Sequence, residues 1–146
     1  MKNSKNGWKL NILLILALTI TIVLGSCAQR VRFRPSKLVP SAQGYVKITK
    51  DESQNHTIKI KVSNVSTPQK LYPSKEVYVV WIETEKNGVK KLGQLEGFLR
   101  YGSNRPGGTL NTVTPFKPIK IFITAEDTGS SNVPGSQILL QTRNFD

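Results

Sequence analysis

The chain has 146 residues, of which 21 are Lys or Arg and 9 are Asp or Glu, so its formal charge is +12; it contains one His, one Cys and 38% hydrophobic residues. This length fits one domain with a single modest core and excludes a large multi-domain enzyme. One cysteine and one histidine are too few for the usual zinc sites, for an iron–sulfur ligand set or for a disulfide framework. We therefore expect neither a bound metal nor a cofactor.

The first 26 residues have the pattern of a signal peptide. Lys2, Lys5 and Lys9 make a basic start, and an apolar run from 12 to 24 follows, interrupted only by two threonines. Thirteen residues match the length of a secretory apolar region, whereas a spanning helix needs about 20. The alternative of an uncleaved membrane anchor is disfavoured because thirteen helical residues extend only about 20 Å.

The run ends in Leu24-Gly25-Ser26-Cys27, which places small residues in front of the single cysteine. This arrangement resembles the lipobox of bacterial lipoproteins. In that family the cysteine thiol is joined to a diacylglycerol and the chain is then cut just before it. The resemblance implies that Cys27 is lipidated and is an attachment point rather than a nucleophile, and two acyl chains would anchor it durably.

Residues 27–43 are predicted to form a lipidated, basic tether. Four cations close to the lipid site are expected to contact anionic headgroups, and two prolines favour an extended chain: Arg30, Arg32, Arg34 and Lys37, beside Pro35 and Pro40. The chain stays strongly basic without its first 26 residues. Such charge is typical of nucleic-acid binding, but export to the envelope argues against that partner.

The two residues after the cysteine indicate in which bacterial membrane such a lipoprotein would be anchored. In Gram-negative lipoproteins an Asp after the cysteine marks retention at the inner membrane, and here Ala28 and Gln29 follow. That resemblance implies anchoring in the outer membrane of a bacterial envelope. The absence of an acidic cluster after Cys27 favours a domain that faces the periplasm.

From residue 44 onward the hydrophobic pattern has a period of two, which is typical of strands. Apolar residues alternate with polar ones around 46–48 and again around 58–62. The segment Val77 to Ile82 is continuously apolar and predicts a central strand covered on both faces. Asn87-Gly88 predicts a type I′ turn that joins Val79 to Glu85 with Val89 to Leu95 in a hairpin.

Three more strands are expected, at 109–114, 119–125 and 137–142, with Gly- and Pro-rich breaks between them. Seven short strands in about 100 residues predict an all-β, immunoglobulin-like antiparallel sandwich over residues 44–146. Trp81 is expected to take the place of the core tryptophan of such sandwiches. Lys59, Lys61 and Lys120 on outer faces would discourage edge-to-edge pairing.

Several motifs in the second half of the chain resemble a known envelope domain. They are 79–82 with its Trp, Leu92-Gly93-Gln94-Leu95, the strand end 121–127 and the loop and strand at 133–139. Together they resemble the extracytoplasmic β-sandwich of the anti-sigma-K factor family, which also occurs alone in small lipoproteins of Bacteroidetes-type envelopes. Sigma-factor binding is not implied, because only eleven residues precede the apolar run.

Candidate site residues are sparse. His56 lies among polar turn residues and is expected to be an exposed surface histidine rather than a general base. Glu126 and Asp127 could offer oxygen ligands to calcium, but their spacing is not that of an EF-hand, and two solvated carboxylates in a turn are the preferred interpretation. No Gly-x-Ser-x-Gly motif or phosphate-binding loop is present.

A loop with aromatic and basic residues is the candidate contact for a partner. Phe98, Arg100, Tyr101 and Arg105 are the residue types that anchor protein or glycan partners. The alternative is that Phe98 and Leu99 cap the open end of the sandwich.

These observations predict a lipid-anchored envelope module that interacts with an envelope protein, a glycan or another ligand and is not an enzyme. The alternatives are a small envelope hydrolase and an accessory regulator of an anti-sigma system.

Overall fold

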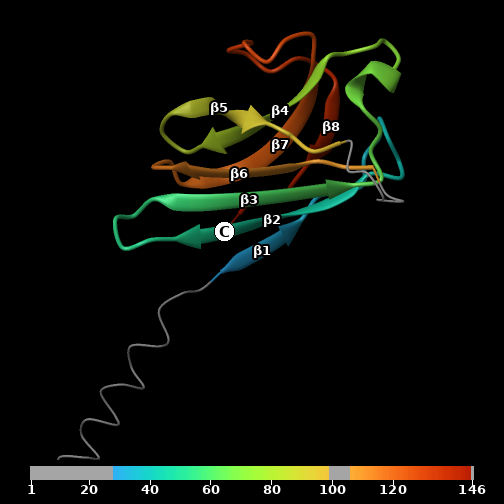
Figure 1. Cartoon of the computed structure of the whole chain (residues 1–146). Helices are drawn as coiled ribbons and strands as arrows, with labels where there is room; N and C mark the ends of the chain where they lie inside the picture. Colours follow the sequence, from blue (N-terminus) through green and yellow to red (C-terminus); the bar gives the residue numbers. More distant parts are fainter. Residues whose placement is uncertain (1–27, 99–105, 146) are drawn as a thin grey trace, which may run out of the picture.

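The computed structural model describes residues 28–98 and 106–145 and shows eight strands and one short 3₁₀ helix (Figure 1). The elements are β1 (Gln29–Arg32), β2 (Gln43–Lys50), β3 (His56–Ser63), η1 (Pro68–Lys70), β4 (Val77–Thr84), β5 (Gly88–Gln94), β6 (Thr109–Thr114), β7 (Pro118–Glu126) and β8 (Ile138–Gln141). Within the described ranges, no helix has the length and apolar character needed to cross a bilayer.

The strands form two antiparallel sheets of four strands each. Sheet A has the order β1-β2-β3-β6, and sheet B has the order β5-β4-β7-β8. Strands β2 to β8 follow an immunoglobulin-like path, in which the chain changes sheet after β3, β5 and β6. The predicted sandwich is confirmed, with eight strands in place of seven.

The additional strand is β1, which lies inside the segment predicted to be a tether. Its four residues pair with β2 from Gln29 opposite Ile48 to Arg32 opposite Tyr45. The next two residues continue this attachment, because the amide of Phe33 donates to the carbonyl of Gly44 and the amide of Arg34 donates to the carbonyl of Gln141 in β8. The segment after Ala28 is therefore folded onto both sheets.

The core lies between the two sheets. Sheet A contributes the residues of one face of β2 and β3, and sheet B contributes alternate residues of β4 and β7 with the end of β8: Val46, Ile48, Ile58, Ile60, Val62, Tyr78, Val80, Ile82, Ile121, Ile123, Ala125, Leu139 and Leu140. Tyr78 is the large aromatic residue of this core, and its hydroxyl donates to the carbonyl of Ser66 at 3.1 Å. Burial raises the pKa of Tyr78 to about 12, so the hydroxyl stays a donor at neutral pH.

Trp81 is fully buried but does not lie in the core between the sheets, so that prediction is wrong. It packs with Val79 and Phe122 on the outer face of sheet B. The loop from 127 to 137 crosses this face, because the Lys91 ammonium donates to the carbonyls of Gly129 and Ser131. The central strand β4 is thus covered on both faces, as its continuous apolar run predicts.

The predicted β4–β5 hairpin is present, with a different turn. Residues 85–87 form the turn, and Gly88 takes a φ of 66°, whereas Asn87 does not have a positive φ. The hydroxyl of Thr84 accepts from the Asn87 amide at 3.0 Å and donates to the Gly88 carbonyl at 2.8 Å. These bonds favour a three-residue turn over the two-residue type I′ turn.

Candidate functional site

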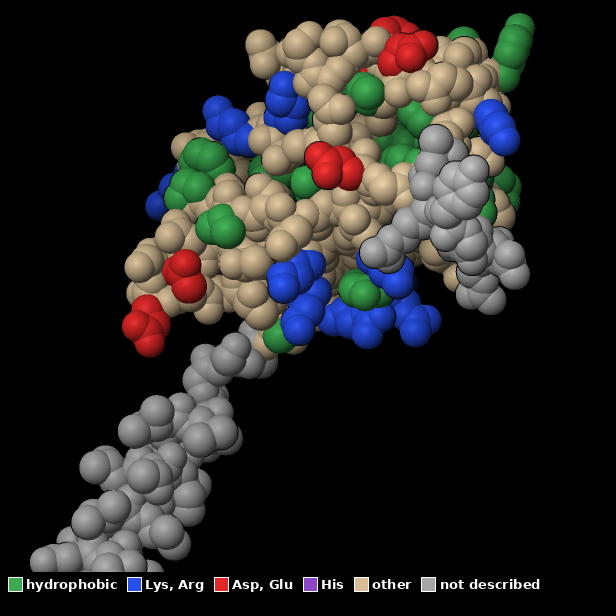
Figure 2. All heavy atoms as spheres, viewed as in Figure 1, with side chains coloured by type: hydrophobic (Ala, Val, Ile, Leu, Met, Phe, Trp, Pro, Cys, Tyr) green, Lys and Arg blue, Asp and Glu red, His purple; other side chains and the backbone are tan. Residues whose placement is uncertain are grey.

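In the described part of the chain, the outer face of sheet A is exposed and strongly basic. Cross-strand pairing places Arg30, Lys47 and Lys59 in one row over three neighbouring strands. A second row contains Arg32, Tyr45 and Lys61. We call the five exposed cations Arg30, Arg32, Lys47, Lys59 and Lys61 the basic face. Lys and Arg side chains gather along the lower border of the molecule in Figure 2, over the strands β1 to β3 of Figure 1.

The four strands of sheet A contain no Asp or Glu. Neither of the two ion pairs found in the described part of the chain involves the basic face: they join Lys75 to Asp127 and Lys120 to Glu83, each at 2.9 Å. Like charges directly opposite one another on neighbouring strands destabilise a sheet. Arg30, Lys47 and Lys59, which lie directly opposite one another in the first row, therefore repel one another. The exposed Glu96 pairs with Thr109 of β6 and lies at the end of the second row.

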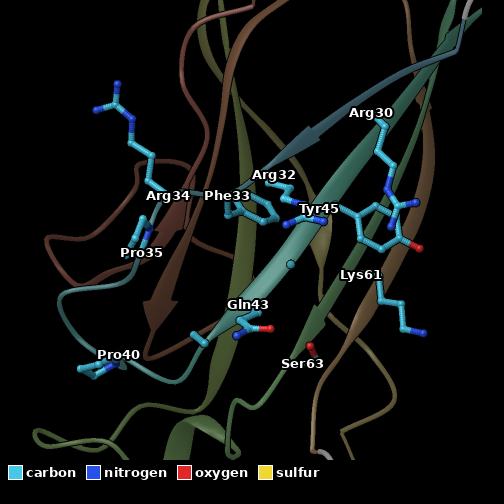
Figure 3. Close-up of a pocket in the computed structure, with 12 residues that line it drawn as sticks. Arg30, Arg32, Phe33, Arg34, Pro35, Pro40, Gln43, Tyr45, Lys61 and Ser63 are labelled. Carbon is cyan, nitrogen blue, oxygen red and sulfur yellow. The ribbon is translucent and has the colours of Figure 1, made fainter.

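One cation of the basic face is held by an aromatic ring. The Arg30 guanidinium lies 3.8 Å from the centroid of the half-buried Tyr45 ring. Figure 3 shows Arg30 and Lys61 on either side of Tyr45, while Arg34 points away from this group. The ring thus fixes the position of one guanidinium and separates two positive charges.

A groove of about 640 Å³ runs beside these residues, between the end of β1, the start of β2 and the end of β3. Its polar lining includes Arg30, Arg32 and Lys61 together with Gln43 and Ser63 (Figure 3). These side chains supply hydrogen-bond donors and positive charge, which suit phosphate, sulfate or carboxylate groups.

Close packing shapes this groove at Gly44. A Cβ atom at this position would lie 2.6 Å from the carbonyl oxygen of Lys61 and 3.1 Å from the Phe33 ring. Phe33 is partly buried and packs against the core. The absence of a side chain at Gly44 therefore lets the chain after β1 lie close to β2.

The residues predicted as the membrane tether have different positions. Arg30 and Arg32 belong to the basic face, whereas Arg34 and Lys37 follow β1 and are exposed. The prediction did not include Lys47, and it assigned Lys59 and Lys61 only to the protection of edges. Alternation within β2 and β3 places these residues on one face, but the pairing with β1 that completes the rows has no sequence signal.

His56 is buried, so the prediction of an exposed histidine is wrong. It is 9% exposed, and its Nδ1 atom has no hydrogen-bond partner among the described residues. Burial is the main cause that lowers the pKa of His56 below 6.5; nearby Lys50 and Lys117 also lower this pKa, against an opposing effect of Asp51. It is the first residue of β3 and faces the same side as Ile58, which explains its burial.

The predicted partner loop is only partly described. Phe98 is half-buried, and its ring lies 5.3 Å from that of Tyr78 between centroids. This packing agrees with the alternative that Phe98 caps the end of the sandwich. Arg100, Tyr101 and Arg105 lie outside the described residues.

Glu126 and Asp127 do not form a pair of solvated carboxylates. Glu126 is 8% exposed and accepts hydrogen bonds from the Thr124 hydroxyl and, at 2.7 Å, from the Gly135 amide. Asp127 is exposed and pairs with Lys75. Throughout residues 28–98 and 106–145, no three His, Cys, Asp or Glu side chains are grouped so that they could hold a metal ion.

Comparison with protein-family models, with curated proteins and with solved structures finds no match to this chain.

Proposed function

We propose that the chain is a lipid-anchored module of the bacterial cell envelope, attached through Cys27, that acts by binding rather than by catalysis. The proposal starts from the sequence: a basic start, an apolar run of thirteen residues and Leu24-Gly25-Ser26-Cys27 form the pattern of a lipoprotein signal. Anchoring in the outer membrane with the sandwich facing the periplasm belongs to the same proposal.

The single observation that carries it is the distance along the chain from Cys27 to the first strand. Gln29 already pairs with Ile48, so one residue, Ala28, separates the cysteine from sheet A. A lipid on Cys27 would hold the sandwich next to the bilayer. The open basic face and its groove, which contain the first strand, then provide the binding surface.

The test is metabolic labelling with a fatty-acid probe in a Gram-negative host that expresses the full chain. We expect label on the wild type, none on Cys27→Ser, and a mature N-terminus at Cys27 by mass spectrometry. A free thiol with intact Met1 would contradict the proposal. A turnover screen against envelope esters and glycans should show no activity, and reproducible turnover would favour the hydrolase alternative.

A further inference from the structure

The two sheets differ in what covers their outer faces. The loop from 127 to 137 lies over the outer face of sheet B, where Trp81 is fully buried. On sheet A, the five cations of the basic face are all exposed. Sheet A therefore offers the open, charged surface in the described part of the molecule.

We propose that the basic face of sheet A lies on an anionic lipid bilayer, where its Arg and Lys side chains bind phosphate headgroups. The choice of a bilayer rather than a soluble polyanion rests on the proposed lipid attachment at Cys27. Ala28 alone separates this cysteine from β1, which itself carries Arg30 and Arg32. The anchor and the face are therefore adjacent.

Charge complementarity supports this partner. The rows Arg30–Lys47–Lys59 and Arg32–Tyr45–Lys61 cross three neighbouring strands, which are spaced by about 4.8 Å. Headgroup phosphates placed among these cations would replace repulsion between like charges with attraction. The strands of sheet A contain no Asp or Glu, and the exposed Glu96, which pairs with Thr109 of β6, lies at the far end of the second row from β1. The positive charge is therefore concentrated over β1, β2 and β3.

The side chains also suit a layer of phosphates. The Arg30 guanidinium is already held over the Tyr45 ring at 3.8 Å, which lowers the conformational entropy that it loses on binding. The groove beside it adds Gln43 and Ser63 as hydrogen-bonding groups. Arginine binds phosphate through paired donors, whereas lysine binds as a point charge.

Residues 28–146 are suitable for the test because all eight strands, their cross-strand pairs and both buried clusters lie within them. This chain lacks Cys27, so its result does not depend on lipidation. The measurement is co-sedimentation with vesicles of phosphatidylcholine alone or with 30% phosphatidylglycerol, in about 50 mM and about 500 mM salt.

We expect binding to the anionic vesicles, little binding to neutral ones, and release at high salt. Lys47→Gln with Lys59→Gln should weaken partitioning about tenfold or more. Arg32→Gln with Lys61→Gln, which neutralises the second row, should do the same. The matched control is Lys70→Gln with Lys86→Gln, which makes the same change in net charge at exposed positions outside sheet A and should bind nearly as well as the wild type.

Three results would overturn the proposal. Equal weakening in the control variant would mean that net charge alone drives binding. Equal partitioning onto neutral vesicles would mean that headgroup charge is not recognised. Heparin binding without vesicle binding would assign the face to a soluble polyanion. Each result is separable from the lipid proposal, because fatty-acid labelling of Cys27 in the full chain is measured independently.

Discussion

At the residue scale, the buried carboxylate of Glu126 joins the end of β7 to the covering loop. It accepts from the Gly135 amide and from the Thr124 hydroxyl. Thr124 in turn accepts from the indole nitrogen of Trp81 at 2.7 Å. This series of bonds satisfies the Trp81 indole, the Thr124 hydroxyl and the Gly135 amide and ties the loop to the end of β7.

Glu126→Ala should lower the free energy of unfolding by about 2 kcal/mol, because it leaves the Gly135 amide and the Thr124 hydroxyl without their acceptor. Glu126→Gln keeps an acceptor oxygen and should cost less. Urea unfolding of residues 28–146 measures both. Equal stability of the alanine variant and the wild type would show that the covering loop does not depend on this carboxylate.

His56 predicts how stability changes with pH. Its folded-state pKa is lowered below 6.5, chiefly by burial. In the unfolded chain the pKa of His56 is about 6.5. Between the lowered pKa of the folded state and this value, the unfolded chain binds more protons than the folded chain. The stability is therefore retained above about pH 6.5 and is lost as the pH falls through the folded-state pKa.

His56→Leu should therefore remove part of the stability loss between pH 7 and pH 5. The measurement is the urea midpoint of residues 28–146 at each pH, for the variant and the wild type. Parallel pH profiles would contradict the prediction, because the carboxylates, which titrate in both proteins, would then account for the whole loss.

At the element scale, the structure distinguishes what periodicity can predict from what it cannot. Alternation correctly predicts β2 and β3, where one face is apolar and the other polar. In β4 both faces are apolar, so the sequence cannot say whether Trp81 or Tyr78 points between the sheets. The additional strand β1 has a single apolar residue, Val31, and its strand character comes from pairing with β2.

The candidate site was only partly predictable for the same reason. Arg30 and Arg32 stand out as cations near Cys27, but their neighbours Lys47, Lys59 and Lys61 belong to other strands. Tertiary pairing brings them together. The burial of His56 could not be predicted from the sequence, because polar residues surround it in the chain. Its side chain points inward because of its register in β3.

Gly44 links β1 to the rest of sheet A. Gly44→Ala should destabilise the domain by about 1–3 kcal/mol, because the new Cβ would lie 2.6 Å from the Lys61 carbonyl oxygen and would press on Phe33. The urea midpoint of residues 28–146 measures the loss, and amide chemical shifts in β1 report the displacement. An unchanged midpoint with unshifted β1 signals would contradict this packing argument.

At the scale of the whole molecule, charge is unevenly distributed. The strands of sheet A contain five exposed cations in β1, β2 and β3 and no acidic residue, while carboxylates lie on sheet B, in turns and beside β6, as at Glu83, Asp51 and Glu96. Residues 28–146 contain 18 Lys or Arg and 9 Asp or Glu, and their formal charge of +9 also opposes the compact state through self-repulsion. Added salt should screen both the repulsion among the cations of the basic face and the repulsion that comes from the net charge.

Raising the salt concentration from about 50 mM to about 1 M should therefore raise the melting temperature of residues 28–146 by several degrees, about 4–8 °C for each kcal/mol of repulsion that is removed. Lys47→Gln with Lys59→Gln should be more stable than the wild type at low salt and should gain less from added salt. A melting temperature that falls with salt would show that ion pairs outweigh the repulsion. The two ion pairs, which are partly exposed to solvent, are expected to contribute little.

The attachment of β1 has a mechanical consequence. A pull on the chain along the axis of β1 would load all four residue pairs with β2 in shear, and the bonds of Phe33 to Gly44 and of Arg34 to Gln141 would share the load. Bonds loaded together resist force better than bonds broken one after another. Tension applied at the N-terminus would thus be distributed into both sheets at once.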